Sequence, residues 1–162
     1  MASKINRRIL RQIPNIFSDN AGFFFIKFWL RDLRKELEGR VTDKFIELLL
    51  MGLNLAFDLS KSFRKNIRNF EGRYLFRTTD NLVAASAIFK NGNMDVRDET
   101  IDDWDARISF KDAAALRDFI FSRDQDILDS ILANTVEVDG NLNYVYKFGF
   151  MARDLSRRLG IQ

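Results

Sequence analysis

Five carboxylates gathered in one short segment are the first candidates for chemistry in this chain. They are Asp98, Glu99, Asp102, Asp103 and Asp105. Such a group could hold a calcium ion or supply a pair of acid–base carboxylates. Its spacing does not match an EF-hand loop, because it lacks the glycine at the turn and the closing glutamate. We therefore interpret the segment as a solvated loop between strands, anchored by Trp104 at the sheet's edge, and predict no metal site.

Two residue types that serve most often in catalysis are missing from the chain. There is no histidine and no cysteine among its 162 residues. Their absence excludes His-dependent triads, His-ligated metals, thiol catalysis, thiolate zinc sites and disulfides. We predict that the protein is not an enzyme and uses no cofactor.

The composition favours contact with something apolar. Hydrophobic residues make up 46% of the chain, and 16 of its residues are Phe, against 2 Trp and 3 Tyr. A Phe side chain supplies apolar bulk without a polar group, which suits the wall of an apolar cavity. The same composition also suits an ordinary close-packed core, and that alternative stays open at this point.

The helix predicted over residues 142–159 is apolar on more than one side. From Tyr144 to Ala152 its only charged residue is Lys147. A surface helix needs a single apolar stripe, so this helix must cover apolar groups on two sides. Those groups belong either to a partner or to a ligand in a cavity against the sheet, and Gly149 would allow a close approach to the ligand or to the sheet.

The predicted cavity wall consists of apolar side chains from the strands and the flanking helices. The candidates are Phe76, Ile88, Ile108, Phe110, Phe119, Ile131, Val136, Val138, Leu142, Val145, Tyr146, Gly149 and Phe150. Ligand pockets are mostly apolar and contain few polar groups, which agrees with this set. The alternative is that these side chains close into a dry core.

The periodicity of apolar residues predicts an α+β fold, with a five-stranded, largely antiparallel sheet covered by helices. The strands are predicted over residues 73–78, 83–90, 94–97, 106–110 and 136–138, and Asn91-Gly92 is a strong hairpin signal. Helices are predicted over 5–13, 19–38, 43–69, 113–121, 127–133 and 142–159, the third broken near Gly52 or Ser60.

The first 42 residues form a predicted basic amphipathic helical arm. The net charge of +3 is uneven, with basic ends around an acidic middle. The residues expected to contact a membrane or a partner are Arg7, Arg8, Arg11, Phe23, Phe24, Lys27 and Trp29. A peripheral membrane contact suits basic and aromatic residues better than DNA binding does, because no helix-turn-helix is recognisable. Packing of this arm on the domain, or a homodimer, is the alternative.

The chain has two long apolar runs, over residues 22–30 and 45–59. Both are shorter than the about 20 residues that a helix needs to span a bilayer. No secretory signal is evident either, because Lys27 interrupts the first run and no small-residue cleavage site follows it. We expect a cytoplasmic protein that meets membranes only peripherally and binds no nucleic acid.

Three segments together resemble the sterol carrier protein type 2 family. The segment ARISFKD at 106–112, followed by a helix with Leu116 and Phe119, resembles an alternating strand and helix of that family. The segment VEVDGNL at 136–142 resembles its last strand, Gly-Asn junction and closing helix. The meander over 74–97 occupies the place of the family's first three strands.

The resemblance implies a lipid-binding domain over residues 43–162. It implies non-catalytic binding or transfer of a fatty acid, an acyl-CoA, a sterol or a prenyl-type lipid in an apolar cavity closed by the C-terminal helix. One branch of the family assists ubiquinone synthesis, so an accessory factor that presents a quinone precursor to membrane enzymes is one alternative. A structural or assembly protein that dimerises through its apolar helices is the other.

Overall fold

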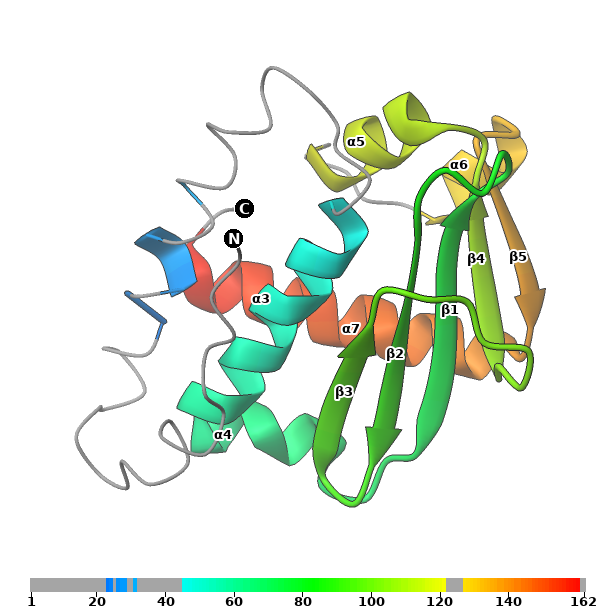
Figure 1. The fold of residues 1–162 in the computed structure, drawn as a ribbon. Coiled ribbons are helices and arrows are strands. Elements are labelled where there is room, and N and C mark those ends of the chain that lie inside the picture. The colour runs from blue at the N-terminus through cyan, green and yellow to red at the C-terminus, as the bar shows by residue number, and fades with distance from the viewer. Residues whose placement is uncertain (1–22, 25, 29–30, 32–44, 122–126, 161–162) are drawn as a thin grey trace.

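The computed structural model describes residues 23–24, 26–28, 31, 45–121 and 127–160 (Figure 1). The helices are α3 (Phe45–Leu59), α4 (Lys61–Arg64), α5 (Ala113–Phe121), α6 (Ile127–Leu132) and α7 (Leu142–Leu159), with a 3-10 turn η1 (Lys65–Ile67). The strands are β1 (Gly72–Thr78), β2 (Ala84–Lys90), β3 (Asn93–Arg97), β4 (Ala106–Phe110) and β5 (Val136–Gly140). Every strand predicted from the sequence is present.

The five strands form one mixed sheet in the order β3-β2-β1-β4-β5. Only one pair, the central strand β1 with β4, is parallel, and the other three pairs are antiparallel. The crossover from β3 to β4 contains the acidic segment, and α5 and α6 connect β4 to β5. The prediction of an α+β fold with a largely antiparallel five-stranded sheet is confirmed.

Two helices cover the same face of this sheet. Figure 1 shows α3 (cyan) and α7 (orange to red) crossing on one side of the strands, with α5 and α6 at the upper end of β4 and β5. Alternation along β1 directs Tyr74 and Phe76 to the covered face, because successive side chains of a strand point to opposite faces. α3 packs over β2 and β3, and α7 packs over β4.

Local sequence signals set the ends of several elements. The long helix predicted over 43–69 is broken at Ser60, not at Gly52, because the Ser60 hydroxyl accepts a hydrogen bond from the Phe63 N–H (3.1 Å) and caps α4. At the β2–β3 hairpin, Asn91 and Gly92 have φ angles of 53° and 68°. Two successive left-handed residues form the type of turn that matches the twist of a hairpin.

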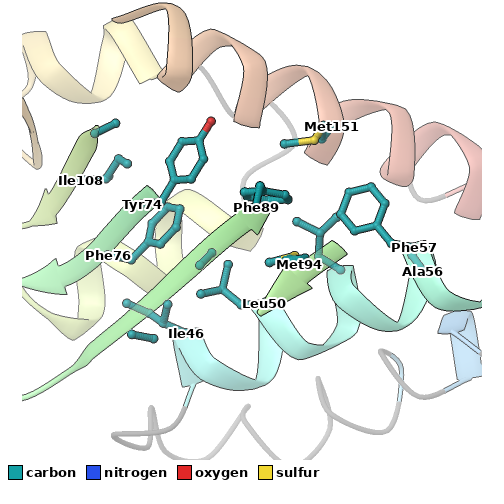
Figure 2. Packing of buried hydrophobic residues seen from close by; sticks show 14 of the residues in the cluster. Ile46, Leu50, Ala56, Phe57, Tyr74, Phe76, Phe89, Met94, Ile108 and Met151 are labelled. Atoms are coloured by element: carbon teal, nitrogen blue, oxygen red, sulfur yellow. The ribbon is translucent and has the colours of Figure 1, made fainter. Parts of the chain in front are cut away.

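The hydrophobic core is closed and aromatic on the side of α3. Phe57 stacks on Phe63 with ring centroids 4.6 Å apart, and Phe89 from β2 meets the Phe57 ring edge-on at 6.1 Å. Figure 2 shows Phe57, Leu50 and Met94 meeting between α3 and the sheet. All three Phe rings are almost fully buried.

The predicted N-terminal helix over 5–13 lies outside the described residues. Of the helix predicted over 19–38, the described residues 23–24, 26–28 and 31 are helical. In the described part of the chain, no helix is both long enough and apolar enough to cross a membrane.

Candidate ligand-binding site

The covered face of the sheet carries five of the residues predicted for the cavity wall. Paired residues share a face, so the strand register places Phe76 beside Ile108 and Ile108 beside Val138. Phe110 pairs with Val136 in the next row. The five side chains belong to one hydrophobic cluster, in which Val138 is only partly buried.

Two helices add predicted residues to this face. The Phe119 ring from α5 lies 5.6 Å from the Phe110 ring, and Val145 from α7 is buried in the same cluster. The predicted residue Ile131 on α6 is half-buried but does not belong to this cluster. We call the strand and helix residues Phe76, Ile108, Phe110, Phe119, Val136, Val138, Val145 and Phe148 the apolar wall.

An aromatic layer forms the centre of this region, and most of it was not predicted. Tyr74 has five aromatic neighbours, with ring centroids 5.3 Å away for Phe148, 5.6 Å for Phe89, 6.1 Å for both Phe76 and Tyr144, and 6.4 Å for Phe70. The Phe148 ring lies 4.9 Å from Phe76. Spacing could have identified two of these residues, because Tyr74 precedes Phe76 by two positions on a strand and Phe148 follows Val145 by three on a helix.

The Tyr74 hydroxyl is a polar group within this aromatic layer. It donates a hydrogen bond of 2.8 Å to the backbone carbonyl of Tyr144 in the first turn of α7. In Figure 2 this hydroxyl points from the strand toward α7. Burial raises the pKa of the Tyr74 phenol, and the nearby Tyr144 and Asp105 raise it further. The phenol therefore stays neutral and hydrogen-bonded to the Tyr144 carbonyl at physiological pH, and this bond positions α7 on the sheet.

Coverage of the apolar wall is uneven. Phe76, Ile108, Phe110 and Val136 are buried, whereas Val138, Phe119 and Phe148 are only partly buried. Leu128 and Leu132 on the nearby α6 are exposed to 52% and 80%. The side of the wall over β5, between α5, α6 and the start of α7, is thus the part that helices cover least.

Four residues of α7 do not lie where the sequence prediction placed them. Leu142, Tyr146 and Phe150 are exposed to 54%, 55% and 57%, on the side of α7 that faces away from the sheet. A Cβ added at Gly149 would meet no atom within 4 Å. The placement of these residues between sheet and helix is wrong, because Val145, Phe148, Met151 and Leu159 occupy that side of the helix.

Ile88 is also misplaced in the prediction. It pairs with Arg73 and Asp95, on the sheet face opposite to the apolar wall. Its neighbours Ala87 and Phe89 are the residues of β2 that point into the core. The error arises because β2 has apolar or small residues on both faces, so periodicity alone does not fix which face is inside.

A polar hollow lies between the segment that precedes β1 and the β2–β3 hairpin. It has a volume of about 370 Å³ and is lined by Arg68, Asn69, Phe70, Glu71 and Asn91. The Phe70 ring in its lining also packs on Tyr144, with centroids 5.7 Å apart. Its mainly polar lining does not suit an apolar chain, so this hollow is separate from the apolar wall.

The acidic segment is built into the fold as a loop. Asp98, Glu99, Asp102 and Asp103 are exposed, as the interpretation of a solvated loop requires. Asp103 and Glu99 form ion pairs with arginines of the uncovered sheet face, Arg73 at 2.7 Å and Arg97 at 3.6 Å. Asp105 instead accepts a hydrogen bond of 2.8 Å from the Arg73 N–H. The half-buried Trp104 stacks under the Arg107 guanidinium at 4.9 Å.

The membrane-contact residues predicted in the N-terminal arm divide into three groups. Arg7, Arg8, Arg11 and Trp29 lie outside the described residues. Phe24 and Lys27 are exposed. Phe23 is buried, with its ring edge-on to Phe63 at 6.4 Å and the Arg158 guanidinium 5.6 Å above it, so its side chain packs on the domain and not at the surface.

Comparison with solved structures identifies relatives of this fold. The sterol carrier protein domain 2 of Helicoverpa armigera matches with a TM-score of 0.50 at 15% identity, over 71% of this chain and 89% of that one. A ubiquinone synthesis protein, UbiJ-SCP2, matches with a TM-score of 0.46 at 20% identity, over 59% of this chain and 78% of that one.

Part of a larger enzyme matches as well. A double mutant of the sec-alkyl sulfatase PisA1 gives a TM-score of 0.50 at 17% identity, over 64% of this chain but only 15% of the sulfatase. Neither the scan of protein-family models nor the search of curated proteins found a match. At these identities the likeness establishes the fold alone. The chain has the sterol carrier protein type 2 fold, as the sequence predicted.

Proposed function

We propose that this protein is a non-catalytic carrier that binds the hydrocarbon chain of a lipid against the apolar wall. The observation that carries the proposal is the incomplete burial, within that wall, of Val138 on β5, Phe119 on α5 and Phe148 on α7. Burying exposed apolar surface stabilises a complex by about 25 cal/mol per Å² of area. A fatty-acyl or prenyl chain lying along this strip would cover those side chains.

The chemistry of the wall supports binding and not turnover. Its members are hydrocarbon side chains, and the Tyr74 phenol behind them is neutral and already hydrogen-bonded to α7. A reaction would need a nucleophile or a titrating group that faces the ligand. A carrier role also agrees with the fold that this chain shares with a sterol carrier protein domain.

The test compares two half-buried strand residues on opposite faces of the sheet. Val138→Trp would fill the partly covered strip, whereas Ile88→Trp adds the same bulk on the opposite face. Binding of a fluorescent polyene fatty acid is measured by titration of the full chain. We expect saturable binding to the wild type, at least about tenfold weaker binding to Val138→Trp, and unchanged affinity for Ile88→Trp.

Native mass spectrometry of gently purified protein provides a second measurement. A bound lipid in the wild type that is depleted in Val138→Trp would support the proposal and reveal the lipid class. Circular dichroism and urea denaturation first establish that both variants are folded. Absence of saturable binding to the wild type, or equal weakening by the two substitutions, would reject the apolar wall as the site.

A further inference from the structure

The outward side of α7 presents an uncovered apolar stripe. Leu142, Tyr146 and Phe150 follow one another at intervals of four residues, which places them on one side of a helix. More than half of each side chain is exposed, at 54%, 55% and 57%. Gly149 beside them meets open space, so no described segment covers this part of the helix.

The remainder of that outward side is cationic. Arg153 and Arg157 continue the stripe over the next turns and are both exposed. Lys147 flanks it, with its ammonium 5.6 Å from the Phe70 ring and 5.7 Å from the Phe150 ring. For Lys147 and Arg153, the described residues provide no ion-pair partner.

The acidic residue of α7 does not reach this surface. Asp154 is the only carboxylate between residues 142 and 159, and its side chain is 5% exposed. It is bound by Arg157 at 2.6 Å and by Arg158 at 3.0 Å. The exposed surface of α7 therefore combines apolar and aromatic side chains with cations and carries no carboxylate.

We propose that α7 docks along its length on an anionic lipid surface through Leu142, Tyr146 and Phe150, with Lys147 and Arg153 over the headgroups. Aromatic and aliphatic side chains settle at the boundary of headgroups and acyl chains, and flanking cations are attracted to anionic lipids. This inference concerns a surface on the far side of α7 from the apolar wall, and it does not depend on ligand binding there.

A second copy of the chain would suit this surface less well. A two-fold contact pairs the same patch on both partners, so it would bury the cations of two helices with no carboxylate from α7 opposite them. An anionic bilayer supplies negatively charged headgroups for the cations and an acyl-chain region for the apolar side chains. Charge complementarity therefore selects the lipid surface as the occupant.

The test is co-sedimentation of the full chain with vesicles, in the absence of any added fatty acid. One set of vesicles contains phosphatidylcholine with phosphatidylglycerol, and the other contains phosphatidylcholine alone. We expect clear binding to the anionic set only. The double variant Tyr146→Ser/Phe150→Ser and the variant Arg153→Glu should each reduce the partition coefficient about tenfold or more.

Matched controls separate this surface from general apolarity and charge. Leu132→Ser removes an even more exposed apolar side chain on α6, and Lys90→Glu reverses an exposed cation at the β2–β3 hairpin. Both controls should bind the anionic vesicles as the wild type does. Because the substituted side chains are exposed, all variants should keep the thermal midpoint of the wild type within a few degrees.

Three outcomes would overturn the proposal. The first is undiminished vesicle binding by the double variant. It includes the case in which substitution of Arg7, Arg8 and Arg11 by Glu abolishes vesicle binding while the double variant binds normally. The second is equal binding to neutral and anionic vesicles. The third is a dimer in solution that the double variant dissociates, with no vesicle binding by either protein. Fatty-acid titration is scored separately, so failure of the carrier function and failure of docking are distinguishable.

Discussion

The Tyr74 hydroxyl donates a hydrogen bond of 2.8 Å to the backbone carbonyl of Tyr144, joining the central strand β1 to the first turn of α7. The two rings also meet edge-on, with centroids 6.1 Å apart. This contact holds α7 over the aromatic layer at a fixed height. It therefore sets how closely the helix approaches the apolar wall.

Replacing Tyr74 with Phe should lower the free energy of unfolding by about 1 kcal/mol, because a buried hydrogen bond is lost while the ring is kept. Urea denaturation followed by far-UV circular dichroism provides the measurement. Tyr144→Phe is the matched control, since the Tyr144 hydroxyl makes no hydrogen bond within the described residues. A larger effect of Tyr144→Phe than of Tyr74→Phe would contradict this assignment.

Asp154 fastens the other end of α7. Its carboxylate accepts hydrogen bonds from Arg157, Arg158 and the Asn66 amide, and Arg158 also donates to the Ser62 hydroxyl at 2.7 Å. We expect Asp154→Asn to lower the free energy of unfolding at neutral pH by about 1–3 kcal/mol. The control Asp102→Asn changes an exposed carboxylate and should shift stability by less than about 0.5 kcal/mol.

The stabilisation by Asp154 should depend on pH. Burial by itself would raise the pKa of Asp154, but the hydrogen bonds from Arg157, Asn66 and Arg158 outweigh burial and lower it below the ordinary value of 3.8. A lowered pKa in the folded state means that the contribution is complete well above 3.8 and disappears as the pH falls through the folded value. The difference in unfolding free energy between wild type and Asp154→Asn should therefore shrink in acid. A difference that grows in acid would contradict the pairing.

Two glycines should respond to alanine in opposite ways. Gly149 lies on the exposed side of α7 with open space around it, so Gly149→Ala should raise the unfolding free energy by about 0.5–1 kcal/mol. Gly140 has a φ of 93°, and a Cβ there would overlap the Asp105 carbonyl. Gly140→Ala should lower stability by about 1–3 kcal/mol. Thermal or urea denaturation of both variants tests the pair, and destabilisation by Gly149→Ala would mean that this side of α7 is covered.

The sequence contained enough information for the order and approximate bounds of the sheet and of α5, α6 and α7. Strand alternation, the Asn91-Gly92 turn and the Gly140-Asn141 junction are local signals, and each depends on a few neighbouring residues. The break at Ser60 was also visible, because a serine before a helical turn is a common cap.

Face assignments were less secure, as β2 illustrates. Its sequence AASAIFK places an apolar residue on each face, Ile88 on one and Phe89 on the other. A shift of one residue exchanges the two faces, and only pairing with β1, where Phe89 lies opposite Gly72, decides between them. The aromatic layer around Tyr74 likewise depends on residues distant in sequence.

For α7, the sequence by itself determined that two sides of the helix are apolar. It could not determine which side meets the sheet, because Leu142, Tyr146 and Phe150 are as apolar as Val145, Phe148 and Met151. The tertiary structure decided this through the Tyr74–Tyr144 hydrogen bond and the Asp154 cluster, which fix the rotation of the helix about its axis. Rotation is a property of contacts between distant segments, and a local periodicity carries no information about it.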